Sequence, residues 1–451
     1  MPAPNHGLKR ELRLRDLVLM RVILIVSLTW TGFAAKQGAT QITLWLFAIA
    51  LFYVPLALVV MKVSRAIPVE GGVYQWVRQG ISPFAGYMAG WSMTIFAISL
   101  YASLGSTLAG GFAYAGGPSA AWMNTSKPFA LGLTALACLI AFGVNVRGLH
   151  LAKWLSGAGS LLTIATLLIM VFLLIKARPT LTLAWPAFSL LTVNVFTRMA
   201  LSALSGFDQC AVFSEECRKP ENDVARSVLI AAPLIALIYI LGTSSILAWT
   251  APDKVDLAAP VSQVMQAGFG SGGAGAWLTG FSVQIFNIAY SASMVVYVGM
   301  IVRLPMVAGW DGLLPPWWSE LHPRYRTPVK AIAAVTLAVM GLGILSLWGA
   351  DNQEASQATA AVGIGSYCFT YLLLFGSVVF GFRKTPERPG SLLRVVSLAA
   401  FLVALVSLVF ELFPLGEVSN QRTFALKVLA AILATNAAGA GLYLSAARRR
   451  I

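Results

Sequence analysis

An acidic side chain stands in the middle of an apolar segment of this chain. Residues 199–219 read MALSALSGFDQCAVFSEECRK, and the apolar run breaks at Ser205, Gly206, Phe207 and Asp208. A carboxylate inside a membrane-like helix is costly unless it has a partner or faces a water-filled cavity. A glycine lets the backbone unwind, which is tolerated at membrane depth only under cover. Residues 205–208 are therefore a candidate ligand site. The alternative is a structural kink, with Asp208 paired to a neighbouring helix.

The composition is that of a membrane protein. Of the 451 residues, 58% are hydrophobic and 11% are charged, and the mean hydropathy is +0.78. Soluble domains are nearer half apolar and a quarter charged. The four cysteines show no disulfide or zinc spacing. No removable signal peptide is expected, because the basic start leads into further apolar runs without a small-residue cleavage site.

Apolar runs of about twenty residues recur along the chain, as membrane-spanning helices require. We predict an all-α polytopic membrane protein with one transmembrane transporter domain at 17–446, a cytoplasmic tail at 1–16 and a basic tail at 447–451. The twelve predicted spans are 17–35, 43–63, 84–113, 129–146, 154–175, 193–213, 227–249, 277–302, 329–348, 358–382, 392–413 and 424–446.

The basic residues are distributed unevenly between the two sides of these spans. With a cytoplasmic N-terminus, 24 of the 32 lysines and arginines fall inside, seven fall outside and Arg198 lies near the outer start of the sixth span. This is the bias that the positive-inside rule predicts for an even number of spans with both termini in the cytoplasm. It accounts for much of the net charge of +15 without nucleic acid. We expect the inner basic loops to contact membrane lipid.

The first and sixth spans are five spans apart, which is compatible with an inverted repeat. The repeats would cover about 17–176 and 193–382, with two further helices at about 392–446. Such repeats place the substrate between two discontinuous helices at the midplane. Thr31, Gly32, Phe33 and Ala34 echo 205–208, so we expect the first span to break there. Two such breaks would offer backbone N–H and C=O groups to a zwitterion.

Further patterns follow in order along the chain. Residues 68–76 read PVEGGVYQW, and 86–91 read GYMAGW. The sixth span precedes Glu215-Glu216 and Lys219-Pro220. The eighth precedes Arg303, then DGLLP at 311–315 and Thr327-Pro328. Over about residues 12–445 the chain resembles the amino acid–polyamine–organocation (APC) superfamily, specifically its bacterial amino acid permeases. The resemblance implies a moving bundle of spans one, two, six and seven.

The chain departs from this family at two places. Many members carry Gly-Ser-Gly at the first break, where residues 31–34 of this chain read TGFA. Here Trp30 and Phe33 would narrow the pocket or alter carboxylate binding. Some proton-coupled members carry a lysine midway along the fifth helix, but Lys153 stands at the start of the fifth span. The substrate and the coupling ion are therefore left open.

A polar-aromatic stripe runs along the eighth span. Asn287, Tyr290, Met294 and Tyr297 are spaced i, i+3, i+7 and i+10, which places them on one helical face. Such a stripe lines a substrate path or serves as packing between helices.

The sequence contains no motif that supports an enzyme or a metal-binding protein. His6, His150 and His322 lack metal-ligand spacing, and no hydrolase or nucleotide-binding motif occurs. We therefore expect no enzyme, metal, cofactor or obligate protein partner. We predict a cytoplasmic-membrane permease that moves an amino acid by alternating access, with Asp208 binding a substrate ammonium, accepting a coupling proton or holding a gate. Proton symport is favoured; exchange, polyamine or other amine transport, and a non-transporting sensor are the alternatives.

Overall fold

The computed structural model describes residues 10–179, 183–346, 352–382, 389–415, 418 and 420–449. These residues form helices, and among them the only extended pairing is an isolated bridge between Leu12 and Cys217. The all-α prediction is confirmed. Parts of the predicted tails, the end of the ninth span and the basic loop at 383–388 lie outside the described residues.

Nine helical segments of the described chain are long and apolar enough to cross a membrane. They contain the longer helices α3 (Gln41–Ala48), α4 (Val54–Ala66), α6 (Pro83–Ala102), α7 (Leu104–Gly116), α9 (Lys127–Arg147), α10 (Leu149–Ala177), α12 (Pro220–Leu247), α14 (Gly273–Trp310), α16 (Asn352–Phe380), α17 (Ser391–Phe410) and α18 (Gln421–Arg448). A π-helical segment, η2 (Ile49–Tyr53), joins α3 to α4. These segments coincide with nine of the twelve predicted spans.

The predicted first, sixth and ninth spans fall on shorter helices. The first is divided into α1 (Leu14–Ile25) and α2 (Trp30–Ala35), and the ninth is α15 (Val329–Ser346). The sixth comprises α11 (Leu190–Arg198), the π-helical η4 (Met199–Ala203) and, after a break, the 3-10 helix η5 (Gln209–Glu216). Length alone therefore does not identify these three as complete spans.

Short helices lie between the predicted spans. Residues 68–76 run into α5, and Tyr74 and Trp76 are buried there. The short elements are η1 (Gly38–Thr40), α5 (Val73–Gly80), η3 (Gly117–Ala120), α8 (Trp122–Thr125), η6 (Pro252–Lys254), α13 (Pro260–Phe269) and η7 (Pro316–Trp318).

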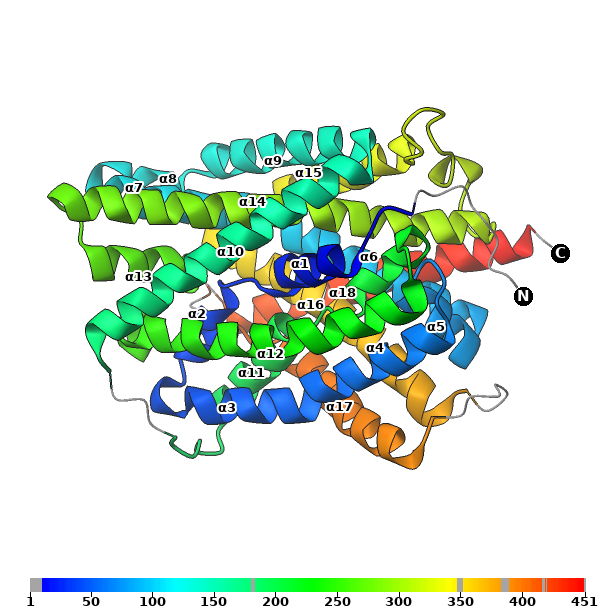
Figure 1. The fold of residues 1–451 in the computed structure, drawn as a ribbon, viewed down its shortest axis with the longest axis horizontal. Helices are drawn as coiled ribbons and strands as arrows, with labels where there is room; N and C mark the ends of the chain where they lie inside the picture. The colour runs from blue at the N-terminus through cyan, green and yellow to red at the C-terminus, as the bar shows by residue number, and fades with distance from the viewer. Residues whose placement is uncertain are drawn as a thin grey trace.

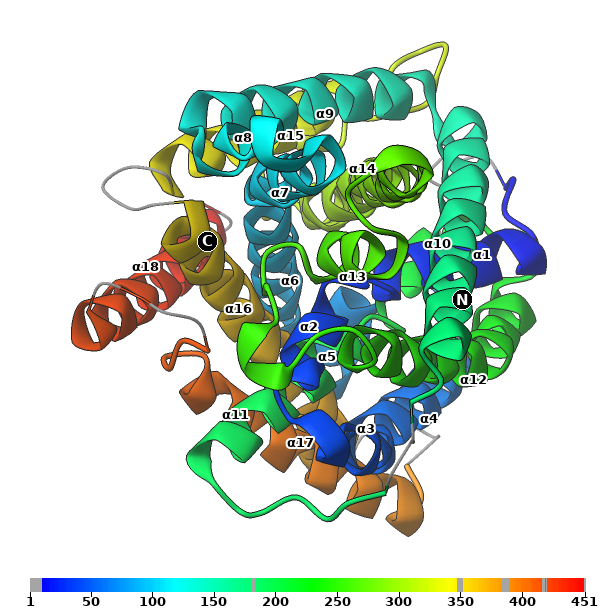
Figure 2. The same cartoon turned by 90° about the vertical axis from the view of Figure 1, so that its left-hand side faces the viewer.

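The broken helices lie in the middle of the bundle. Figure 1 shows the long helices running along the longest axis, with the start of α10 and the end of α18 at the same end. Figure 2, along the helix axes, shows α2 near the centre and α1 running outward beside α10 and α12, with α9, α10, α17 and α18 at the rim. Large apolar side chains are exposed on that rim, among them Leu139 and Ile175. Outward-facing apolar residues on helices are expected where the surroundings are lipid.

A buried ion pair ties α11 to the end of α17. Arg198 Nη1 lies 3.0 Å from Glu411 Oε2, and the two side chains are 5% and 0% exposed. The Arg198 guanidinium also lies over the Phe33 ring, 5.9 Å from its centroid. The pair thus joins the sixth span, the eleventh span and α2.

We predict that Glu411→Gln lowers the thermal unfolding midpoint in detergent strongly. Removal of one partner leaves an uncompensated buried charge, which costs about 3–5 kcal/mol. The matched control is Glu320→Gln, because Glu320 forms a pair with Lys330 whose side chains are 54% and 62% exposed. Exposed pairs contribute about 0–1 kcal/mol. Equal midpoints for the two variants would contradict the prediction.

Candidate functional site

The first break lies one turn earlier than predicted. Residues 26–29 are non-helical, whereas Thr31, Gly32, Phe33 and Ala34 belong to α2. The Tyr239 hydroxyl oxygen accepts a hydrogen bond from the Ser27 N–H at 3.2 Å. A side chain thus replaces the helical carbonyl as the partner of this backbone group. Gly32 serves close packing instead, because a Cβ on it would lie 2.8 Å from Pro260. The similarity of residues 31–34 to residues 205–208 therefore did not predict the position of the break.

The second break falls where it was predicted. The π-helical η4 ends at Ala203, the chain is irregular through 204–208, and η5 begins at Gln209. Gly206 has a φ of +118°, in the region that favours glycine. A Cβ added there would lie 3.0 Å from Ile25 Cγ1 and 3.1 Å from Gln209 Cδ. Gly206 is thus required both for the backbone conformation and for the close approach of α1.

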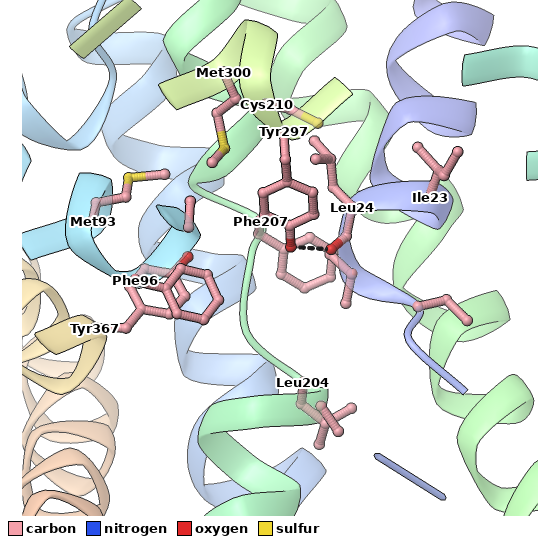
Figure 3. Packing of buried hydrophobic residues seen from close by; sticks show 14 of the residues in the cluster. Ile23, Leu24, Met93, Phe96, Leu204, Phe207, Cys210, Tyr297, Met300 and Tyr367 are labelled. Atoms are coloured by element: carbon pink, nitrogen blue, oxygen red, sulfur yellow. Dashed lines mark hydrogen bonds between the residues drawn. The ribbon is translucent and has the colours of Figure 1, made fainter. Parts of the chain in front are cut away.

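Side chains from other helices bind the backbone groups that these breaks release. Tyr297 donates its hydroxyl to the Leu24 carbonyl at 2.5 Å, as Figure 3 shows. Tyr239 donates to the Ile25 carbonyl at 2.7 Å. Arg21 Nη1 donates to the Phe207 carbonyl at 2.5 Å. A buried backbone group without such a partner would be costly in a membrane.

Asp208 is fully buried between the break and α16. Tyr371 donates to Asp208 Oδ1 at 2.9 Å, and Tyr367 donates to Asp208 Oδ2 at 3.1 Å. The Tyr371 oxygen also accepts the Gly206 N–H at 2.9 Å, and the Tyr367 oxygen accepts from Gln209 Nε2 at 3.1 Å. Each tyrosine therefore both donates to the carboxylate and accepts from the broken segment. A carboxylate with two donors suits its ionised form.

A positive charge accompanies the carboxylate. Arg21 is 0% exposed, and its guanidinium binds the carbonyl of Phe207, the residue before Asp208. Its Nε donates to Ser227 Oγ at 2.8 Å, and Nη2 donates to the Val224 carbonyl at 3.1 Å. Arg21 is one of the 24 basic residues that the sequence assigned to the inner side. The structure places it inside the bundle, where it joins α1 to the second break and α12.

A small cavity lies between the two breaks, α6 and α14. Four predicted ligand residues line it, namely Trp30, Ser205, Tyr290 and Tyr297. Its free volume is ≈ 30 Å³, room for only a few water molecules. The Ser202 hydroxyl lines the cavity and has no hydrogen-bond partner within the described chain. An unpartnered buried hydroxyl in a cavity wall is a group that a polar ligand can bind.

The other predicted ligand residues lie outside this wall. Asp208 and Phe207 lie behind it, and the Phe207 ring packs on Tyr53 with centroids 4.7 Å apart. Phe33 packs beside Trp30, at 5.3 Å between centroids. Asn287 is 3% exposed and lies against α7, where a Cβ on Gly111 would meet its amide at 3.0 Å. The helical stripe therefore splits, since Tyr290 and Tyr297 face the cavity and Asn287 packs against a neighbour. Thr31 bonds to the Leu28 carbonyl.

Several site residues were missed in the sequence. Tyr367 and Tyr371 are spaced i, i+4 in an apolar span, a pattern that places both hydroxyls on one face. Phe96 of α6 stacks on Tyr367 with ring centroids 4.1 Å apart (Figure 3) and also lines the cavity. Tyr101 completes the wall from α6 and hydrogen-bonds to Ser293 of α14 at 2.9 Å. Only the tyrosine spacing was a usable signal.

A second charged cluster lies between the site and one end of the bundle. Arg303 Nη2 lies 2.6 Å from Glu216 Oε2, and Arg303 Nε lies 3.6 Å from Glu70 Oε1. The Glu215 N–H donates to Glu70 Oε2 at 2.8 Å. Burial, followed by the negative charge of Glu216, raises the pKa of Glu70 well above its ordinary value, although Arg303 opposes this. The cluster joins α14, η5 and the 68–76 segment.

Comparison with known proteins gives one consistent result. The family model described as amino acid permease matches residues 17–434. An uncharacterized transporter of Legionella pneumophila is 24% identical over 85% of this chain and 84% of its own length. The branched-chain amino acid permease BcaP of Bacillus subtilis is 23% identical over 85% of this chain and 83% of its own. A methylthioribose transporter of Bacillus subtilis is 24% identical over 76% and 77%.

We predict that Gly206→Ala lowers both the unfolding midpoint and any activity of the site. Alanine is strained at a positive φ, and its Cβ would press on Ile25. Gly132→Ala is the matched control, because a Cβ at Gly132 in α9 meets nothing within 4 Å. That change should be neutral or stabilise by about 0.5–1 kcal/mol. Comparable losses in both variants, measured by thermal unfolding, would refute this role of Gly206.

We also predict that Glu70 makes stability depend on pH. A carboxyl whose pKa is raised by folding loses a proton more easily in the unfolded chain, so stability falls as the pH rises from the ordinary value of 4.5 through the raised pKa. In Glu70→Gln the unfolding midpoint should depend less on pH across this range. Glu320→Gln, on the exposed surface, should keep the wild-type slope. An unchanged slope in Glu70→Gln would show that Glu70 does not titrate there.

Proposed function

Because this chain belongs to the amino acid permease family, we propose that it is a secondary active transporter that moves an amino acid across the cytoplasmic membrane by alternating access. The observation that carries the proposal is the family match over residues 17–434. It is supported by the small cavity between two broken helices, whose wall includes the Ser202 and Ser205 hydroxyls; transporters use this arrangement at the membrane midplane.

We propose that the spans form a five-plus-five inverted repeat followed by two helices. The discontinuous first helices would be α1 with α2, and α11 with η4 and η5. The two breaks are adjacent, since a Cβ on Gly206 would lie 3.0 Å from Ile25 at the end of α1, and this supports the assignment. Both termini would be cytoplasmic, since the basic residues are concentrated on that side of the predicted spans.

The proposed substrate site is the cavity between the breaks. The Ser202 and Ser205 hydroxyls and the backbone of residues 26–28 would bind the charged groups of an amino acid, and Trp30, Tyr290 and Tyr297 would contact its side chain. The present volume of ≈ 30 Å³ holds no amino acid. Substrate must therefore enter a more open conformation, in which α1 and α14 separate. The Tyr297–Leu24 hydrogen bond is the contact that such a separation would break.

We propose that Asp208 accepts the coupling proton and closes the site, without touching the substrate in this conformation. Its carboxylate holds Tyr367 and Tyr371 of α16 against the second break. Protonation would turn one acceptor oxygen into a donor and weaken one of these bonds. A proton would thereby release α16 from the broken helix. Exchange remains the alternative mechanism, in which Asp208 acts only as a structural contact.

The substrate is tested by uptake into proteoliposomes. The panel holds branched-chain amino acids and methylthioribose, after the relatives above, together with acidic amino acids and polyamines. Each solute is tested with and without an inward proton gradient. Gradient-stimulated uptake of one amino acid would support the proposal. Uptake that requires a preloaded lumen would indicate an exchanger, and uptake of a polyamine or methylthioribose alone would reassign the substrate class. Silence across the panel from folded protein would contradict transport of these solutes and would indicate an untested solute or a non-transporting sensor.

We predict that Asp208→Asn abolishes transport or its proton dependence without preventing folding. Asparagine retains an oxygen that can accept from Tyr367 and Tyr371, but it carries no charge and does not titrate. Tyr371→Phe should weaken coupling less, because Tyr367 remains bonded to the carboxylate. Glu320→Gln is the control for loss of an exposed carboxylate. Wild-type uptake with a wild-type pH profile in Asp208→Asn would exclude the proposed role.

A further inference from the structure

A second cavity lies at the end of the bundle where α9 ends and α10 begins. Its volume is ≈ 100 Å³, and its wall includes Arg147, Lys153, Ser156, Arg324 and Arg326. We refer to it as the basic cavity. The two arginines of the 322–328 segment also line it. The cavity is separate from the substrate site, with which it shares no lining residue.

The basic cavity carries an excess of positive charge. Two of its cations have acidic partners: Arg303 binds Glu216 at 2.6 Å, and Lys153 lies 3.7 Å from Glu11. The same Glu11 oxygen lies 3.7 Å from His150 Nδ1. Arg147, Arg324 and Arg326 form no ion pair within the described part of the chain. Both acidic side chains of the wall are therefore already engaged, and three guanidinium groups are available to an anion.

Neutral hydrogen-bond donors reinforce this charge. Helix α10 starts after Gly148 with no side-chain cap, so its first N–H groups and the positive end of its dipole have no capping partner. Ser156, two turns along, is 2% exposed, lines the cavity, and its hydroxyl has no partner among the described residues. A helix start, an orphan hydroxyl and several guanidinium groups together match the oxygen-rich surface of a phosphate.

We propose that the basic cavity binds the phosphate group of an anionic membrane phospholipid. Figure 2 shows α9 and α10 at the rim of the bundle, where acyl chains can lie. Leu151 and Trp154 lie on α10 beside the cavity-lining Lys153 and Ser156, and their side chains are 37% and 67% exposed. Tryptophan is typical of the membrane interface. Basic pockets between membrane helices are suited to anionic headgroups, and guanidinium forks bind phosphate oxygens in pairs.

The bound lipid would stabilise one particular junction. A phosphate in the basic cavity would bridge Arg324 and Arg326 to the start of α10 and to Arg147, so that the 322–328 segment is held against α9 and α10. This requires only that the chain is embedded in a membrane. It does not depend on the substrate or on proton coupling.

The test is lipid binding to the purified full chain in detergent. Native mass spectrometry would count retained dioleoylphosphatidylglycerol against dioleoylphosphatidylcholine, and the unfolding midpoint would be measured with each lipid and with inorganic phosphate. Arg324→Gln with Arg326→Gln should weaken phosphatidylglycerol binding about 30-fold, since each basic residue contributes about 1 kcal/mol. Arg448→Gln with Arg449→Gln, the basic pair at the end of α18, is the matched control and should retain wild-type binding.

A second variant separates the site from general charge. Ser156→Ala removes a hydroxyl that has no partner among the described residues, so the lipid-free midpoint should not fall. Its phosphatidylglycerol affinity should fall about two- to tenfold, the effect of one hydrogen bond. Equal losses in the α18 pair would mean non-specific attraction and overturn the proposal. So would wild-type affinity in both cavity variants, or stabilisation by inorganic phosphate with none by the lipid.

Discussion

The structure depends on one constraint: a helix that is broken inside a membrane must find new partners for the backbone groups it releases. The described chain meets it with side chains from distant segments. Tyr297 and Tyr239 bind the carbonyls at the end of α1, Arg21 binds the Phe207 carbonyl, and Tyr371 binds the Gly206 N–H. Without them, each released group would cost several kcal/mol in a medium without water.

The same requirement explains why charge is buried beside the breaks. Arg21 brings a cation into the centre of the bundle in order to bind a carbonyl, and a lone buried cation is unfavourable. Asp208 supplies the opposite charge from within the broken segment, and the two tyrosines of α16 satisfy its oxygens. The acidic residue that interrupts the apolar run is therefore part of the solution to the break, and its carboxylate forms the contact with α16.

The sequence predicts this architecture unevenly, for physical reasons. Long apolar runs are local signals, so nine spans and the helical class follow from hydropathy. The second break was predictable because Gly206 and Asp208 both disfavour a continuous membrane helix. The first break was misplaced because Gly32 has another role, close contact with Pro260. Tyr367, Tyr371 and Arg21 were not identified because a hydrogen-bond partner 158 to 186 residues away depends on helix rotation, which a single sequence does not show.

The choice of partners also bears on movement. A backbone bond inside a continuous helix is replaced only by unfolding the helix, whereas a tyrosine hydroxyl can leave a carbonyl when water takes its place. Such an exchange costs little net free energy, since a typical hydrogen bond contributes about 0.5–1.5 kcal/mol over its hydrated alternative. The Tyr297–Leu24 bond lies at the wall of the central cavity, so water would replace it directly in the proposed open conformation, in which α1 and α14 separate. The breaks are thus the places in this bundle where helices can separate without leaving backbone groups unbound.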